Sequence, residues 1–253
     1  MDAQRLERES HIWMTLNHCN IAPLLGVVIS DELGLISPWY RNGNVRDYIY
    51  QHPEADRIKL VSDVACGLAY LHNRTPSVVH GDLKNDNVLI TETGCAVIID
   101  FGLSSIIEDD PTLNASFGTA SVQGAGNTRW MAPELLMEED ATRSPSTDVY
   151  SFGCVALYIY TEEIPFKDIS DHKIPFTMSR GRKPLKERDD YHRLSASSIE
   201  WLYDILVSCW DLKPSLRPSM ATIEKEIKRH VPKRTSQEII QYQQIYSTPA
   251  FFE

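Results

Sequence analysis

Residues 78–90 read VVHGDLKNDNVLI, a polar centre between two apolar ends, which predicts a loop between buried segments. Within six positions this loop offers a carboxylate (Asp82), a cation (Lys84) and an amide oxygen (Asn87). Phosphoryl transfer needs a base for the acceptor hydroxyl, a cation near the phosphate and oxygen ligands for Mg²⁺. Asp and Asn also favour ordinary solvated turns. The loop alone therefore leaves two interpretations open, a phosphoryl-transfer site and a plain turn.

A second carboxylate follows in residues 98–102, which read IIDFG. Asp100 stands at the exit of an apolar strand, and Phe101 and a conformationally permissive glycine come after it. An acid in this place can hold a metal on a loop that changes conformation. Alone the motif is typical of a simple turn. Because it follows the Asp82 loop and a hairpin, we interpret it as a metal site.

Hydrophobic spacing and capping signals predict the elements around these loops. We expect five helices, at Ala3–Leu16, Asp56–Asn73, Thr147–Tyr160, residues 197–210 and Ser219–His230. Short apolar runs predict four strands, at Ile21–Ile29, Leu33–Tyr40, Val88–Ile90 and Ala96–Ile99. Ser104–Asn127 is rich in small and polar residues, so we expect a long loop there.

The composition bounds the class of protein. The chain has 253 residues, 42% of them hydrophobic and 24% charged, which is typical of globular proteins and excludes long disorder. Its net charge of −10 argues against nucleic acid or an anionic membrane as the main partner. Residues 1–10 do not read as a signal peptide, and the longest apolar run, Cys154–Tyr160, is too short to span a bilayer. The five widely spaced cysteines fit neither a disulfide framework nor a zinc site. We therefore expect no membrane segment and a reducing, cytoplasmic location.

Six motifs occur in order along the chain: His80–Asn87, Asp100–Gly102, Ala132–Glu134, Asp148–Gly153, Cys209–Trp210 and Arg217–Pro218. In this order they resemble the eukaryotic protein kinases, and the resemblance runs from about Glu9 to Arg217. Lys84, two positions after Asp82, resembles the serine/threonine kinases, whereas Arg129–Glu134 and Cys209–Trp210 resemble their tyrosine-kinase-like branch.

The resemblance implies a role for each residue of the site. Asp82 and Lys84 would be catalytic, the first as the base and the second as the cation that stabilises the transferring phosphate. Asn87 and Asp100 would hold Mg²⁺, and ATP would be the phosphate donor to a protein substrate. The other expected contacts of ATP are Ser37 as gatekeeper, Pro38–Tyr40 as the hinge that hydrogen-bonds adenine, Leu89 beneath the adenine ring and Glu9 as the acid of the regulatory helix.

The fold implied by the resemblance is α+β and two-lobed, with a truncated N-lobe and a mainly α-helical C-lobe. Residues 1–40 would form the residual N-lobe with one helix and two strands, residues 41–230 the C-lobe, and residues 231–253 a tail. Glu134 and Arg217 are expected to form a buried ion pair, and Asp148 is expected to support the backbone of the catalytic loop.

Two departures from the family pattern bear on function. Gly81 stands where most kinases place an arginine that pairs with a phosphorylated activation loop. The glycine-rich loop and the phosphate-binding lysine normally precede the regulatory-helix acid, but the first glycine here is Gly26 and the first lysine is Lys59. We therefore expect either an incomplete version of a longer kinase or a truncated kinase-like protein.

Three functions follow from these observations. The first is ATP-dependent phosphorylation of Ser or Thr in proteins, and its main alternative is a catalytically impaired pseudokinase that acts as a protein-binding module. The third is a small-molecule phosphotransferase of the aminoglycoside kind, which shares the His-Gly-Asp spelling. That class lacks the Ala-Pro-Glu and Asp-Val-Tyr-Ser-Phe-Gly motifs found here, which disfavours it.

Overall fold

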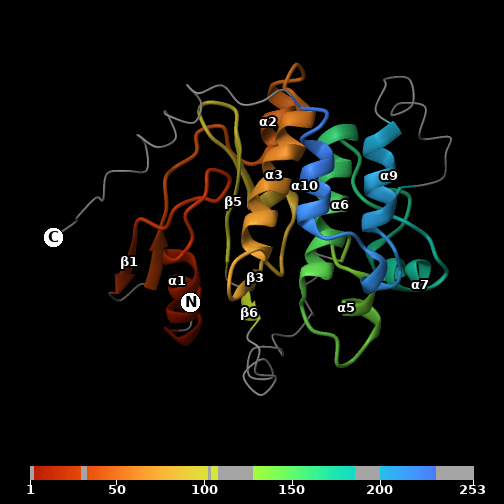
Figure 1. Cartoon of the computed structure of the whole chain (residues 1–253), viewed down its shortest axis with the longest axis horizontal. Coiled ribbons are helices and arrows are strands. Elements are labelled where there is room, and N and C mark those ends of the chain that lie inside the picture. Colours follow the sequence, from red (N-terminus) through yellow and green to blue (C-terminus); the bar gives the residue numbers. More distant parts are fainter. Residues whose placement is uncertain (1–2, 30–32, 102–103, 108–127, 186–199, 232–253) are drawn as a thin grey trace.

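The computed structural model describes residues 3–29, 33–101, 104–107, 128–185 and 200–231. At one side of the molecule lie helix α1 (Ala3–Met14) and an antiparallel pair of strands, β1 (Gly26–Ile29) and β2 (Leu33–Ile36) (Figure 1). Helix α1 contacts β2, and the partly buried Leu35 of that strand packs against the hydrophobic core.

The middle of the chain builds the loops that carry the site. In order it contains α2 (Val45–Gln51), α3 (Arg57–His72), β3 (Ser77–Val79), the 3-10 turn η1 (Asn85–Asn87), β4 (Val88–Ile90), β5 (Ala96–Ile98) and β6 (Ser105–Ile107). Strands β4 and β5 form one antiparallel pair, and β3 and β6 form another. The two pairs are short, so their positions depend on the helices against which they pack.

Helices dominate the rest of the described chain. They are α5 (Pro133–Met137), α6 (Pro145–Thr161), the 3-10 turn η3 (Asp171–Lys173), α7 (Ile174–Ser179), α9 (Glu200–Cys209), the 3-10 turn η4 (Pro214–Leu216) and α10 (Met220–Ile227). Helix α3 contacts both α6 and α10, and α6 contacts α9 (Figure 1). In the described ranges, no helix is both long and apolar enough to cross a bilayer.

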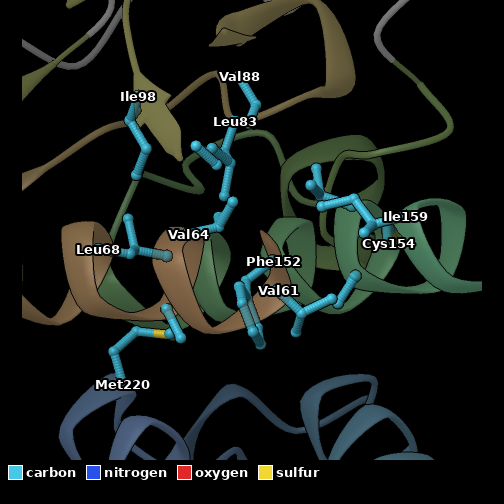
Figure 2. Close-up of a cluster of buried hydrophobic side chains, with 14 of the residues drawn as sticks. Val61, Val64, Leu68, Leu83, Val88, Ile98, Phe152, Cys154, Ile159 and Met220 are labelled. Atoms are coloured by element: carbon cyan, nitrogen blue, oxygen red, sulfur yellow. The ribbon is translucent and has the colours of Figure 1, made fainter. Parts of the chain in front are cut away.

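Helix α6 lies in the centre of the core, because it is apolar on nearly every side. Every residue from Thr147 to Ile159 is buried except Ser151. Figure 2 shows side chains of α3, β4, β5 and α6 in one cluster, with Leu83 of the loop between Val88 and Val64 and with Met220 of α10 at the bottom. The loop with Asp82 is therefore tied to the most buried part of the molecule through Leu83, which is 1% exposed.

The expected helices are confirmed to within a few residues. Helix α3 has Asp56 and Asn73 as its caps, and the Asp56 carboxylate accepts a hydrogen bond from the backbone N–H of Lys59 at 2.9 Å. The helices expected at Ala3–Leu16, Thr147–Tyr160 and Ser219–His230 are α1, α6 and α10. The helix expected at residues 197–210 is α9. Residues 197–199, where α9 was expected to begin, lie outside the described residues.

Two expected strands are shorter than predicted. The stretch Ile21–Ile29 is a strand only from Gly26, because Pro23 has no N–H to donate to a ladder; Ile21 makes an isolated parallel bridge with Ile98. The stretch Leu33–Tyr40 is a strand only to Ile36, shortly before Pro38. Residues 30–32, between these two stretches, lie outside the described residues.

Helices α2, α5 and α7 and strands β3 and β6 were not predicted. Helix α2 begins after Asn44, whose side chain accepts a hydrogen bond from the N–H of Asp47 at 2.9 Å, and it buries Val45 and Ile49. An N-cap asparagine before two apolar residues four positions apart was the available signal. The expected loop 104–127 is wrong at its start, because residues 105–107 form β6; residues 108–127 and 232–253 lie outside the described chain.

Candidate functional site

The backbone at the start of the Asp82 loop is held by one buried carboxylate, that of Asp148. Its two oxygens accept hydrogen bonds from the N–H of His80 at 2.8 Å and the N–H of Gly81 at 2.9 Å. His72, at the end of α3, places Nε2 at 2.9 Å from the same carboxylate. Asp148 lies in the first turn of α6 and is 1% exposed, so it joins the loop to the core helix. This confirms the supporting role expected for Asp148.

His80 serves the structure of the loop through both of its ring nitrogens. Nδ1 accepts a hydrogen bond from the N–H of Asp82 at 3.2 Å, so the proton of the neutral ring is on Nε2. Nε2 lies 2.9 Å from the carbonyl oxygen of Ile99 and donates to it. With 0% of the residue exposed, the ring orients Asp82 and links its loop to the end of β5.

Asp82, Lys84 and Asn87 are brought together. Lys84 Nζ lies 2.6 Å from Asp82 Oδ2, and Asn87 Nδ2 donates to the backbone oxygen of Asp82 at 2.9 Å and lies 3.4 Å from Oδ2. The side chains of Asp82 and Lys84 are 13% and 20% exposed, so both are fixed and yet reachable from solvent. A carboxylate held between a cation and an amide can accept the proton of a hydroxyl group, as a general base does.

Asn87 and Asp100 are placed by neighbouring parts of one hairpin. The N–H of Ile99 donates to the carbonyl oxygen of Asn87 at 3.0 Å, and Asp100 follows with a positive φ of 65°. Asn87 donates through Nδ2, and no donor within the described residues reaches its Oδ1. The pair therefore offers an amide oxygen and a carboxylate, which are the hard ligands that Mg²⁺ prefers.

Asn87 and Asp100 fit Mg²⁺ better than they fit a metal ion that is bound by protein side chains alone. No group of three or more His, Cys, Asp or Glu side chains in the part of the chain that the structure describes could hold a metal ion. Mg²⁺ is commonly bound by one or two protein ligands together with the phosphates of a substrate and water. Gly102, the third residue of the expected metal motif, lies outside the described residues.

A series of aromatic contacts links α1 to this loop. The ring of Trp13 lies 5.3 Å from that of Phe101, which lies 5.4 Å from the ring of His80. Trp13 also donates from Nε1 to the carbonyl oxygen of Ala22 at 2.6 Å. Glu9 is buried and stands one helical turn before Trp13, so it belongs to the same face of α1. The structure thus places Glu9 on the side of the helix that faces Phe101.

The residues expected to contact adenine lie between β2 and β4. Ser37 and Pro38 are half-buried, whereas the side chain of Tyr40 is buried and its carbonyl oxygen accepts a hydrogen bond from the N–H of Gly43 at 3.1 Å. Leu89 is partly buried and points to the opposite face of β4 from the fully buried Val88 and Ile90. Its strand is tied to the segment after Tyr40 by a bridge between Asn44 and Leu89.

The chain around Ala132–Glu134 is anchored by two arginines. Arg217 donates from both terminal nitrogens to the two oxygens of Glu134, each at 2.7 Å, which confirms the expected buried ion pair. Arg129 was not singled out for this function by the sequence pattern. It donates to the carbonyl oxygens of Pro165, Phe166 and Ile169 at 2.7–2.8 Å and pairs with Asp171 at 2.6 Å.

Comparison with known proteins matches this geometry to a family. Residues 1–227 match the family described as protein tyrosine and serine/threonine kinase. The chain is similar to the serine/threonine-protein kinase CTR1 of Arabidopsis thaliana, with 32% identity over 223 residues, which cover 85% of this chain and 25% of that protein. It is also similar to a probable serine/threonine-protein kinase, qkgA, of Dictyostelium discoideum, with 30% identity over 88% of this chain and 14% of that protein.

A third relative is the mitogen-activated protein kinase kinase kinase zak-1 of Caenorhabditis elegans, with 26% identity over 88% of this chain and 30% of that protein. The chain therefore spans less than a third of the length of each of these relatives.

Proposed function

The chain belongs to the protein tyrosine and serine/threonine kinase family, and we propose that it transfers the γ-phosphate of ATP to Ser or Thr hydroxyls of protein substrates. The observation that carries the proposal is the arrangement around Asp82. Its carboxylate is 2.6 Å from Lys84 Nζ, and the backbone just before it is fixed by Asp148. Family membership supports kinase chemistry, and the serine/threonine specificity rests on Lys84 and on the names of the relatives.

In this mechanism Asp82 orients the acceptor hydroxyl and accepts its proton. Lys84, now paired with Asp82, turns toward the phosphate and stabilises its negative charge during transfer. His80 and Asn87 keep Asp82 in place, because each is hydrogen-bonded to it. Holding the reacting groups in line contributes most of the rate enhancement in phosphoryl transfer.

Asn87 and Asp100 are the residues that would hold Mg²⁺, which when bound neutralises charge on the ATP phosphates. We assign the adenine to the segment Ser37–Tyr40, through its backbone, and to Leu89 beneath the ring. Glu9, on the buried face of α1, is assigned to the phosphate side of the site.

A phosphate-transfer assay tests this proposal. The purified chain is incubated with Mg²⁺, radiolabelled ATP and a general protein acceptor such as myelin basic protein or casein, beside Asp82→Ala and Asp100→Asn. We expect phosphoserine or phosphothreonine with the unchanged chain and its loss in Asp82→Ala. Asp100→Asn should abolish Mg²⁺-dependent binding of ATP while the circular dichroism spectrum stays the same. Transfer at an unchanged rate in Asp82→Ala would contradict the assignment.

One observation favours the alternative of a catalytically impaired kinase-like binding module. No lysine occurs before Lys59, and Lys59 Nζ is occupied at the β4–β5 turn, 3.2 Å from Cys95 Sγ and 3.3 Å from the Gly94 carbonyl oxygen. Residues 1–58 as they stand therefore supply no lysine to draw the α- and β-phosphates into place. Calorimetric titration with Mg²⁺–ATP distinguishes the two functions, since a pure binding module gives no nucleotide signal and no transfer.

A further inference from the structure

The two peptide groups that flank the Cα of Gly81, directly before Asp82, are held by residues at the start of one helix. Its N–H donates to Asp148 Oδ1 at 2.9 Å, and its carbonyl oxygen accepts a hydrogen bond from Arg143 Nε at 3.0 Å. Gly81 has a φ of 80°, a backbone conformation that glycine adopts without strain. Asp148 therefore holds the His80–Gly81 peptide and Arg143 holds the Gly81–Asp82 peptide, the second of which sets the direction of the backbone at Asp82.

Arg143 and Asp148 hold a fixed distance from each other because they flank the N-terminus of α6. Ser144, the N-cap between them, accepts a hydrogen bond from the N–H of Thr147 at 3.3 Å, and Thr147 Oγ1 accepts one from the N–H of Ser144 at 3.0 Å. This reciprocal capping box makes the first turn of α6 rigid. Arg143 therefore directly precedes the rigid first turn of the core helix α6.

The charges around Arg143 explain why a cation belongs there. Burial lowers the pKa of Arg143 from its usual value, and the nearby carboxylates of Asp82 and Asp148 act in the opposite direction. The guanidinium remains charged, because an arginine side chain keeps its proton at any physiological pH. With Lys84 it balances the charge of Asp82 in the loop and of the buried Asp148 in α6.

From this geometry we infer that Arg143 is a positioning residue for the proposed phosphoryl transfer: it fixes the Gly81 peptide and thereby the orientation of Asp82. The inference rests on the proposed function, but the contact on which it depends is separate from catalysis. It also places a cation beside the catalytic loop in the absence of an arginine at position 81. Arg143 at the start of α6 then orders this part of the loop, and a phosphate group on the activation loop is not needed for it.

The experiment compares the unchanged chain with Arg143→Met, which removes the donor and the charge, and with Arg143→Lys, which keeps the charge. Arg180→Met is the matched control, because its guanidinium lies 4.5 Å from the ring centroid of the exposed Phe176. Amide hydrogen exchange over residues 78–83 is the first measurement. We expect about tenfold faster exchange at His80 and Gly81 in Arg143→Met, and no change in Arg180→Met.

The second measurement is steady-state transfer with Mg²⁺–ATP. We expect kcat to fall about 100-fold in Arg143→Met with the KM for ATP within a factor of about two, because the acceptor side of the site is misaligned. Arg143→Lys should recover part of the loss. Unchanged exchange at His80 and Gly81, or an equal change in kcat and KM, would overturn the inference. If the unchanged chain transfers no phosphate, the proposed function fails, whereas the exchange measurement still decides whether Arg143 holds the loop.

Discussion

Arg217 shows how much of the C-terminal half depends on one side chain. Besides its two bonds to Glu134, it donates from Nη1 to the carbonyl oxygen of Ser146 and from Nε to that of Asp211, each at 2.9 Å. Its guanidinium also lies 5.3 Å from the ring centroid of Tyr150. Helix α5, helix α6 and the residues after α9 therefore meet at this group, and none of its side chain is exposed.

We expect Arg217→Ala to lower the free energy of unfolding by about 3–5 kcal/mol, because the Glu134 carboxylate is left buried and unpaired. Chemical denaturation of the purified variant measures the loss. Arg229→Ala, which removes an exposed guanidinium paired with Glu226, is the control and should cost less than about 1 kcal/mol. A midpoint in Arg217→Ala equal to that of the unchanged chain would contradict the pairing.

Cys209 makes stability depend on pH in the alkaline range. Burial raises the pKa of its thiol to about 12, although Arg217 nearby acts in the opposite direction. In the unfolded chain a thiol has a pKa of about 8.5, so the unfolded state loses its proton first as the pH rises. Stability contributed by the neutral buried thiol is then complete below pH of about 8.5 and is lost between about 8.5 and 12.

Between about pH 9 and 11 the free energy of unfolding should therefore fall less steeply with pH in Cys209→Ala than in the unchanged chain. The difference in slope should be up to about 1.4 kcal/mol per pH unit. The measurement is a series of urea unfolding curves across this range. Cys19→Ala is the control for removing a thiol outside the buried core, because Cys19 is only partly buried. Parallel pH dependence in Cys209→Ala and the unchanged chain would refute the assignment.

At the scale of elements, the contact of α6 with α9 requires a residue without a side chain. A Cβ added at Gly153 would lie 2.6 Å from Trp210 Nε1 and 2.8 Å from the Cβ of Cys209, both in buried residues. We expect Gly153→Ala to destabilise the protein, because overpacking costs about 1–3 kcal/mol. This cost outweighs the gain of about 1 kcal/mol in helix propensity.

Thermal and urea unfolding of Gly153→Ala measure the effect. Gly34→Ala is the matched control, because a Cβ at Gly34 in β2 meets nothing within 4 Å. We expect its stability to stay within about 0.5 kcal/mol of the unchanged chain. A Gly153→Ala variant more stable than the unchanged chain would show that α6 and α9 can separate at no cost.

At the scale of the whole molecule, α1 connects to the Asp82 loop through Trp13, Phe101 and His80, and β2 contacts α1. Since residues 1–58 contain no lysine, we expect residues 1–253 by themselves to bind ATP weakly and to transfer phosphate slowly. Fusing a glycine-rich hairpin and a lysine-bearing strand ahead of Met1 should raise ATP affinity and transfer together, because a lysine could then pair with Glu9.

The measurement is a radiolabelled transfer assay on both forms, with Asp82→Ala in each as the control for contaminating kinases. Rapid transfer by residues 1–253 that disappears in Asp82→Ala would show that another part of this chain cradles the phosphates.

The division into residues 1–40, 41–230 and 231–253 and the cytoplasmic location stay predictions.

The sequence by itself determined the family, the order of the motifs and the long helices. Regular spacing in α3 and the apolar surface of α6 are local signals, and the residues Asp82, Lys84 and Asn87 are close in sequence, so a short loop is enough to bring them together. The Glu134–Arg217 pair followed from the family pattern and is confirmed.

Only the tertiary structure decided which distant groups hold that loop. The bonds from Gly81 to Arg143 and Asp148, and from His72 to Asp148, join residues more than 60 positions apart. Strand β6 likewise exists through its pairing with β3 and has no strong pattern of its own. Such contacts depend on how helices and strands pack in three dimensions, and a single polar side chain that meets a distant backbone group leaves no periodic pattern in the sequence.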